Sequence, residues 1–325
     1  MEVRRISSPP PNAAAFIAEI AAGIEALYGP LAAEHYRRTA PEGLCATLAH
    51  PTVYAVAAFN EWGEALGYLV AVQRAPAAHI TFLNVLSGWD GQSIENRLVE
   101  RAAGDFQRAG LDHIVCECVP FCRLDLSCTF SAFGFERIER VLMMASVQDT
   151  GSAPKARAPI SSAVAGPSTP RVLTLDAGLR RAAAECLVEA YRDSRGRRLH
   201  MEVTDVDRAQ VFVSRVAAGG FGHVHAEYGK AVFEGDQCVA VALGCETAPD
   251  VGFVLQVAVR PKWRRQGFGT LLLHELAASF RQTGLTRVAL GVTRDNPARL
   301  LYERLGFTAL RPVDAYVWWR PGREP

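Results

Sequence analysis

The stretch VAVRPKWRRQGFGT, residues 257–270, carries an apolar run into a basic turn and then into the start of a helix. Gly267 and Gly269 let the backbone approach a ligand closely and turn several N–H groups towards one point. The positive end of the helix dipole lies at the same point. Arg264 and Arg265 can add charge-assisted contacts. The stretch therefore predicts a phosphate-binding turn. For the glycine pair taken alone, the alternative is a helix start that needs tight backbone packing.

A second motif, NPARLLYERLGF at residues 296–307, follows the next predicted strand. Together the two motifs resemble the GNAT N-acetyltransferase superfamily, whose acetyl-CoA loop reads R/Q-x-x-G-x-G/A and whose later signature reads N-x-x-A-x-x-x-Y-x-x-x-G-F. The residues matched to the loop are Arg264, Gly267 and Gly269. Those matched to the later signature are Asn296, Tyr302, Gly306 and Phe307.

The resemblance implies an acetyl-CoA site. Backbone N–H groups from Arg265 to Thr270 would hold the pyrophosphate, residues 257–259 would pair with the pantetheine like an added strand, and Asn296 would hydrogen-bond it. A bulge that opens the strand would leave the N–H near Val257 to polarise the thioester carbonyl. Tyr302 is similar in position to the general acid that protonates the thiolate; an aromatic packed under the Gly-Phe pair is its alternative role. The implied acetyl-CoA-binding residues are Val257, Val259, Arg264, Arg265, Gln266, Gly267, Phe268, Gly269, Thr270, Asn296 and Tyr302.

The general base is the least determined part of this predicted site. Many members of the superfamily carry a glutamate where this chain has Gln256, and a glutamine cannot accept the proton of an amine. Glu246, at the end of the preceding predicted strand, is the catalytic candidate taken forward. The alternatives are Glu227, His223, His225 and a chain of water molecules.

Outward from these motifs, the same order of predicted elements occurs on both sides of a segment rich in proline, serine and alanine. We therefore predict an internal duplication, with two tandem GNAT folds of the α/β class, each a mixed, mostly antiparallel sheet flanked by helices. The predicted first domain covers residues 1–148, the linker 149–170 and the catalytic domain 171–325. The second copy is expected to have strands at 230–233, 237–245, 252–259 and 287–292, helices at 267–282 and 298–305, and a closing hairpin at 308–320. The first copy is expected to have strands at 52–59, 65–73, 79–86 and 113–119 and a helix at 93–109.

The first copy lacks the residues that would bind CoA. Aligning the helix ends and the two Gly-Phe pairs places Ser93 opposite Gly267, Glu95 opposite Gly269, Phe130 opposite Tyr302 and Leu124 opposite Asn296. A carboxylate repels the pyrophosphate, and side chains obstruct the close approach of the backbone. We therefore predict a first domain that supports or caps the second without binding CoA; a shifted register is the alternative.

Composition and charge exclude several classes of function. The chain has 35 basic and 34 acidic side chains and a net charge of +1, which favours neither nucleic acid nor an anionic membrane as a partner. No segment has the length of a membrane crossing or the pattern of a signal peptide, and scattered cysteines suit a reducing compartment, so we expect a cytoplasmic protein. The clustered cysteines 116, 118, 122 and 128 fit no zinc-knuckle spacing, so small buried thiols are expected and no metal site.

The predicted function is transfer of an acetyl group from acetyl-CoA to a primary amine, directly within a ternary complex. An acyl-CoA-binding regulatory protein with little catalysis is the alternative, favoured by Gln256. Residues 189–222 are expected to form helices that roof the acceptor site, with arginines that either face an acidic acceptor or form a solvated surface. The acceptor, a small-molecule or a protein amine, stays open, as do the acyl-chain preference and the choice between a monomer and a homodimer.

Overall fold

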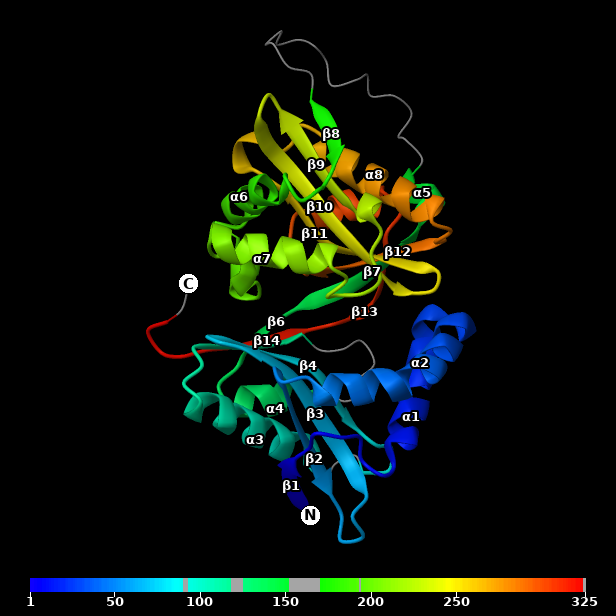
Figure 1. The fold of residues 1–325 in the computed structure, drawn as a ribbon, viewed down its shortest axis with the longest axis vertical. Helices are drawn as coiled ribbons and strands as arrows, with labels where there is room; N and C mark the ends of the chain where they lie inside the picture. The colour runs from blue at the N-terminus through cyan, green and yellow to red at the C-terminus, as the bar shows by residue number, and fades with distance from the viewer. Residues whose placement is uncertain (90–92, 118–124, 152–169, 193, 324–325) are drawn as a thin grey trace. The chain divides into compact units, whose positions relative to one another are not determined.

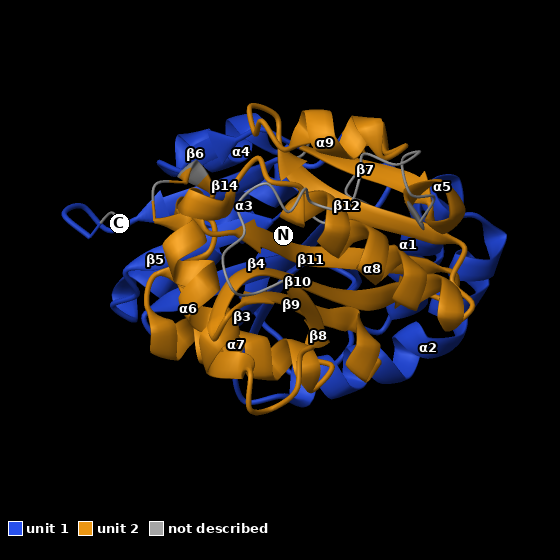
Figure 2. Ribbon diagram, turned by 90° about the horizontal axis from the view of Figure 1, so that it is seen from above, with its two compact units in different colours: residues 1–140, 312–324 blue, residues 141–311, 325 orange. Residues whose placement is uncertain are grey.

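A computed structural model describes residues 1–89, 93–117, 125–151, 170–192 and 194–323 of the chain. The chain divides into two compact units, coloured separately in Figure 2: Met1–Arg140 with Pro312–Glu324 form unit 1, and Val141–Arg311 form unit 2. Each unit contains a mixed, mostly antiparallel sheet flanked by helices, which confirms the predicted fold class. Within the described ranges, no helix is both long and apolar enough to cross a membrane.

In unit 1, helices cover both faces of the sheet (Figure 1). Tyr68 and Leu69 are neighbours on β3 and so point to opposite faces. Tyr68 contacts Phe16 of α1 (Ala13–Tyr28), which packs with α2 (Pro30–Ala49), whereas Leu69 joins the core under α3 (Ile94–Arg108) and α4 (Ser127–Ala132). The strand order is β1 (Glu2–Arg5), β2 (Val53–Phe59), β3 (Ala65–Arg74), β4 (Ala77–Val85), β5 (His113–Glu117), β14 (Ala315–Trp319) and β6 (Glu136–Ile138).

Unit 2 repeats this arrangement. On β10, Val241 and Leu243 pack with α6 (Arg180–Tyr191) and α7 (Val206–Ala217), whereas Ala240 and Ala242 pack under α8 (Phe268–Gln282). The strand order is β13 (Thr308–Pro312), β7 (Arg140–Ser146), β12 (Arg287–Thr293), β11 (Val251–Val259), β10 (Gln237–Ala248), β9 (Gly229–Glu234) and β8 (Arg171–Thr174). The remaining elements are α5 (Val147–Gly151), α9 (Arg299–Arg304), η1 (Arg195–Arg198), η2 (Met201–Val203), η3 (Ala226–Tyr228) and η4 (Pro261–Trp263).

The closing strands differ from the prediction. The expected hairpin at 308–320 is wrong, because β13 lies in the sheet of unit 2 and β14 lies in the sheet of unit 1. Conversely, β7 comes from the first half of the sequence and joins unit 2, where Met143 and Ala145 enter the core. Tyr316 of β14 enters the core of unit 1. The alternation of apolar and polar residues along a strand shows which side chains are buried. Which strand it pairs with depends on the core that those side chains fill.

The predicted domain boundaries shift for the same reason. Residues 312–324 belong to unit 1 and not to the expected domain 171–325, and residues 141–148 belong to unit 2. The expected linker at 149–170 overlaps α5, where the Thr150 hydroxyl donates to the Leu305 carbonyl at 3.3 Å. The rest of the expected linker, 152–169, lies outside the described residues. So do Cys118 and Cys122 of the cysteine cluster, while Cys116 is buried and Cys128 is exposed.

Matching contacts in the two units confirm the internal duplication. Tyr54 packs edge to face on Phe106 with ring centroids 4.7 Å apart, and Tyr228 packs on Phe280 in the same way at 4.7 Å. Each phenylalanine lies in the long helix of its unit. Its carbonyl accepts the N–H of the leucine that follows the helix-ending glycine, at 3.1 Å in unit 1 and 3.0 Å in unit 2.

Candidate active site

The strand β11 separates from its parallel neighbour β12 after Val254. The two strands pair only from Val251 to Val254, although β11 continues to Val259 and β12 to Thr293. At the same point the register of β10 on β11 skips Leu255, so a bulge lies where the strands part. A bulge bends its strand and raises the local twist. Beyond Val254 the β12 side of β11 is therefore an edge to which an extended ligand can be added.

The bulge also changes which side chains face each helix layer. Val254 and Val257 both pack on the α8 side, although residues three apart on an uninterrupted strand point to opposite faces. Leu255 and Ala258 pack on the side of α6 and α7. Gln256 is buried on that side, where its Oε1 accepts a hydrogen bond from the Tyr191 hydroxyl at the end of α6.

The loop after β11 exposes backbone N–H groups at the start of α8. Gly267 is the N-cap of α8 and has a left-handed backbone with φ +91°, which favours glycine. The first hydrogen bond of the helix runs from Leu271 N–H to the Gly267 carbonyl at 2.9 Å. The N–H groups of residues 268–270 have no acceptor among the described residues. Three donors at the positive end of a helix form an anion-binding point.

The basic side chains before this helix have different surroundings. Arg264 donates to the Val259 carbonyl at 3.3 Å and to the Ala190 carbonyl on α6 at 2.7 Å, so it ties the loop to the domain. This supporting role was not expected from the sequence. Arg265 is exposed and has a left-handed backbone with φ +66°. Gln266 donates to the Lys262 carbonyl at 3.2 Å.

The structure brings the second motif against the first. A Cβ added at Gly269 would lie 3.3 Å from Leu301 Cδ2, so α9 packs directly on the first turn of α8. Tyr302 on α9 is half-buried, with its ring 5.9 Å from that of Phe307. Burial raises the pKa of Tyr302 to about 12. The phenol therefore keeps its proton at neutral pH and can donate it.

The segment that contains this geometry matches a known family. The sequence model of the acetyltransferase (GNAT) family matches residues 181–307, a range that includes the bulged strand and both motifs. Residues 181–307 form a GNAT acetyltransferase domain. A curated relative of this chain is the [ribosomal protein bS18]-alanine N-acetyltransferase of Haemophilus influenzae, 34% identical over 76 residues. The match covers 23% of this chain and 51% of the relative, about half of that protein's length.

Solved structures support the tandem GNAT architecture of the whole chain. A GCN5-related N-acetyltransferase from Sphaerobacter thermophilus superposes with a TM-score of 0.64 at 21% identity, over 100% of this chain and 96% of that one. A tandem GNAT protein from the clavulanic acid biosynthesis pathway superposes with a TM-score of 0.60 at 16% identity, over 100% and 99%. At these identities the likeness establishes the fold.

Asn296 of the GNAT domain has a structural partner of its own. Its Oδ1 accepts the Ala298 N–H at 2.9 Å. Asn296 precedes Tyr302 by six residues, whereas the family signature places the asparagine seven residues before the tyrosine, where this chain has Asp295. The match of Asn296 to the signature is therefore displaced by one residue, and its contact with pantetheine stays a prediction.

The base candidates do not gather at the parting of β11 and β12. Val257 pairs with Ala242 on β10, and Glu246 lies four residues further along that strand, about 13 Å away at about 3.3 Å per residue. Glu246 lies beside His223 and His225 instead. Glu227 accepts from Lys230 at 2.5 Å and from Thr174 at 2.9 Å, and these bonds hold the pKa of its carboxyl below the usual value.

Sequence reasoning missed the hydrogen bond that joins the segment 189–222 to Gln256 of β11. Tyr191 holds Gln256 by a hydrogen bond, and the ring of His200 packs edge to face on Tyr191 with centroids 5.8 Å apart. His200 Nδ1 lies 3.1 Å from Glu202 Oε1. All but Gln256 lie in the segment 189–222, which folds into short helices as expected. No local signal pairs Tyr191 with Gln256, because the two residues are 65 positions apart.

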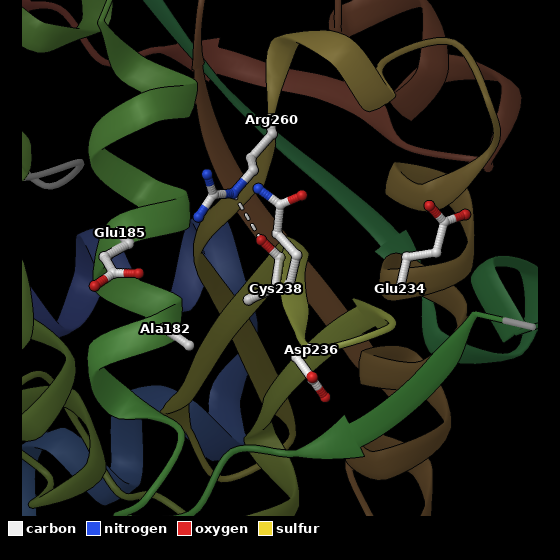
Figure 3. A pocket seen from close by; sticks show the side chains of 7 residues that line it. Ala182, Glu185, Glu234, Asp236, Cys238 and Arg260 are labelled. Carbon is white, nitrogen blue, oxygen red and sulfur yellow. Dashed lines mark hydrogen bonds between the residues drawn. The ribbon is translucent and has the colours of Figure 1, made fainter. Parts of the chain in front are cut away.

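A hollow of about 560 Å³ lies on the α6 side, past the end of β11 (Figure 3). Glu185, Glu234 and Asp236 contribute carboxylates to its lining. Arg260 also lines it, but its guanidinium donates to the Cys238 carbonyl at 2.7 Å and pairs with Glu189. Carboxylates repel phosphate and Arg260 is already neutralised, so this hollow does not suit CoA.

Proposed function

We propose that the GNAT domain transfers an acetyl group from acetyl-CoA directly to a primary amine, with both substrates bound together. The observation that carries this proposal is the bulged, open edge of β11 next to the unpaired N–H groups at the start of α8. A strand edge fits the amide-rich pantetheine, and a helix N-terminus fits the pyrophosphate. CoA has both parts, a pantetheine arm followed by a pyrophosphate.

In this proposal the chain's own groups stabilise the charges of the reaction. The N–H near Val257, on the open edge, donates to the thioester carbonyl oxygen as negative charge develops there. As the amine nitrogen forms its bond to the carbonyl carbon, the C–S bond breaks. Tyr302 then protonates the departing thiolate. Its raised pKa makes it a weak acid, and the same burial would raise the pKa of the CoA thiol beside it.

Removal of the amine proton needs a route other than a carboxylate at Gln256. Glu246 is too far from Ala242, the partner of Val257, for direct contact with the amine, so it can act only through intervening water molecules. An amine that binds in its neutral form needs no strong base, because orientation beside the thioester supplies much of the rate enhancement. The rate should then follow the fraction of neutral acceptor.

The acceptor is a primary amine of a small molecule or of a protein. The Haemophilus relative, named for the alanine of a ribosomal protein, supports a protein N-terminus as the first acceptor to test and a cytoplasmic location. In this proposal unit 1 binds no CoA, so one acetyl-CoA binds per chain.

The proposal is tested by calorimetric titration of the full chain with acetyl-CoA, using two matched glycine variants. Gly267 and Gly284 both have φ +91° and open space where a Cβ would be, at the start and just past the end of α8. Gly267→Glu and Gly284→Glu therefore impose the same strain and the same charge. Only the first places its carboxylate where the pyrophosphate would bind.

We expect one site per chain, weakened at least about 100-fold by Gly267→Glu and less than about threefold by Gly284→Glu. Equal losses in the two variants would attribute the effect to the helix itself and would remove the phosphate site. Binding without turnover for any amine would favour the alternative function, an acyl-CoA-binding regulatory protein, which Gln256 also favours.

A further inference from the structure

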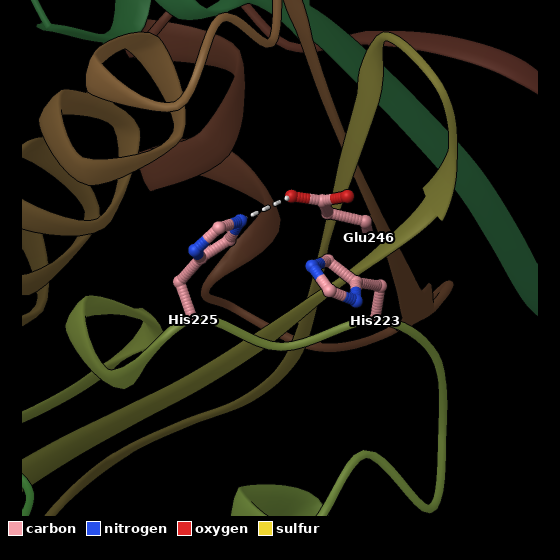
Figure 4. A group of neighbouring side chains, drawn as sticks. All are labelled: His223, His225 and Glu246. Atoms are coloured by element: carbon pink, nitrogen blue, oxygen red, sulfur yellow. Dashed lines mark ion pairs between the residues drawn. The ribbon is translucent and has the colours of Figure 1, made fainter.

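Two histidines and a glutamate of unit 2 gather away from the proposed acetyl-CoA site. Figure 4 shows His223 and His225 on the segment before β9 and Glu246 on β10, with their polar ends turned towards one another. The nearest ligand atoms of the three side chains lie within 4.8 Å of one another. His225 Nε2 and Glu246 Oε1 are 3.3 Å apart.

The backbone holds this arrangement together. The Glu246 N–H donates to the His223 carbonyl at 2.7 Å, and the two residues form an antiparallel bridge. Residues paired in this way, and residues two apart on an extended segment, share a face. Gly222 permits the approach, because a Cβ there would lie 2.3 Å from the Glu246 carbonyl oxygen and its φ is +144°. The three side chains are therefore presented to one point by the fold.

A neighbouring tyrosine orients the carboxylate. The buried Tyr228 hydroxyl donates to Glu246 Oε1 at 2.7 Å and also contacts the Thr283 hydroxyl after α8. Hydrogen bonds of this kind commonly fix the ligands of metal ions. The histidines are exposed, so an ion can reach the site from solvent.

We propose that His223, His225 and Glu246 bind a divalent transition-metal ion, with zinc as the preferred ion. Two imidazoles and a carboxylate are a donor set that zinc accepts, and water can complete the tetrahedron. Ligand atoms about 2.0–2.1 Å from zinc lie about 3.3 Å apart, the separation already present between His225 and Glu246. Rotation of the exposed His223 side chain closes the remaining distance.

The bound ion would link the segment before β9 to β10. That segment follows α7 and contains the left-handed glycines Gly219 and Gly222. The site lies about 13 Å along β10 from the partner of Val257, so the ion would take no direct part in acetyl transfer. Its expected effect is to stabilise unit 2 by binding the folded state.

The test is equilibrium dialysis of the metal-free full chain against zinc, and against cobalt with visible spectra, without acetyl-CoA. We expect one zinc per chain and a cobalt spectrum of tetrahedral type without the near-ultraviolet thiolate band that cysteine ligands produce. His223→Ala, His225→Ala and Glu246→Gln should each weaken binding at least about tenfold, and Tyr228→Phe about tenfold. Glu246→Gln keeps the hydrogen bond with Tyr228, which separates loss of a ligand from loss of the fold.

Two controls match these variants. His35 is an exposed histidine on α2 of unit 1, and Glu227 is a neighbouring carboxylate already paired with Lys230. His35→Ala and Glu227→Gln should leave the affinity for zinc unchanged. No bound zinc would overturn the proposal and leave only the contact of His225 with Glu246. Binding that persists in the His223→Ala/His225→Ala chain, or a cobalt spectrum with thiolate bands, would overturn it in favour of cysteine ligands.

Discussion

The long helices of the two units start from the same backbone but present different chemistry. Gly267 caps α8 and Ser93 caps α3, and both have a left-handed backbone, with φ +91° and +54°. This confirms the predicted alignment of Ser93 with Gly267 and of Glu95 with Gly269. Glu95 brings a carboxylate into the first turn of α3, where the dipole of its own helix stabilises negative charge. We therefore predict that the start of α3 binds no phosphate, although its backbone matches that of α8.

Other parts of the proposed active site occur in both units. The register of β3 on β4 skips Thr81, as that of β10 on β11 skips Leu255, and among the described residues β4 pairs with β5 over four positions. The bulge in the central strand is thus a property of the fold and does not by itself indicate acetyl-CoA binding.

Phe130 and Tyr302 form a second matched pair. The N–H of Phe135 donates to the Phe130 carbonyl at 3.1 Å, and that of Phe307 to the Tyr302 carbonyl at 3.0 Å, which confirms their alignment. Phe130 is fully buried and stacks on Tyr316 at 4.5 Å, whereas Tyr302 is half-buried. The same position is core in one unit and a proposed proton donor in the other. Leu124, the expected counterpart of Asn296, lies outside the described residues.

The largest expected effect is that of Tyr302→Phe on turnover. Loss of a general acid should lower kcat by about 10²–10⁴-fold while the Kd for acetyl-CoA changes less than about twofold. Steady-state kinetics with an amine found by screening, together with calorimetry, measure the two quantities. The reciprocal change, Phe130→Tyr, should leave kcat unchanged. Unaltered turnover in Tyr302→Phe would remove this residue from the mechanism.

Truncation of Phe130, the counterpart of Tyr302 in unit 1, should lower the stability of the fold and not the turnover. Phe130→Ala leaves a cavity in the core and should lower the free energy of unfolding of unit 1 by about 3–5 kcal/mol. Denaturant titration followed by circular dichroism measures this loss. Phe130→Leu, which keeps most of the volume, should cost less than about 1.5 kcal/mol. A loss below about 1 kcal/mol for the alanine variant would mean that Phe130 contributes little to this core.

The pH dependence of turnover should reflect the raised pKa of Tyr302. A proton donor is active while protonated, so its activity is lost as pH rises through its pKa. With a pKa of about 12, nearly all of Tyr302 is protonated at pH 10.5, whereas an ordinary tyrosine would be about one quarter protonated. We expect about fourfold more activity at pH 10.5 than an ordinary tyrosine would allow, with circular dichroism as the control for folding. An alkaline fall centred near pH 10 would contradict the buried environment of Tyr302.

The smallest effect concerns the two helix caps. Ser93→Gly relieves a left-handed backbone in a residue with a Cβ and should stabilise unit 1 by about 0.4–1 kcal/mol. Gly267→Ala introduces the same strain into unit 2 and should cost about 1 kcal/mol. Thermal unfolding of both variants beside the wild type measures the two shifts. Shifts of the same sign would show that the caps are not equivalent.

Much of the site could be predicted from the sequence because its parts are local. The turn at Gly267, the helix it opens and Tyr302 depend on contacts within a few residues, whereas Gly269 packs against Leu301. Apart from the closing hairpin, the expected elements agree with the structure to within about three residues. The role of Arg264 could not be predicted, since its partner Ala190 lies more than 70 residues away. The same holds for the hydrogen bond between Tyr191 and Gln256.

The sequence by itself determined the two tandem GNAT folds, because helix starts, turns and alternating strands follow from neighbouring residues. The phosphate-binding turn in the second copy and its loss in the first stay predictions. The tertiary structure alone decided that β7 and β14 exchange sheets, because strand partners depend on which core their side chains fill. It also decided that Glu246 lies beside His223 and His225 and not beside Val257. The register between paired strands sets which residues become neighbours, and no single stretch of sequence contains that register.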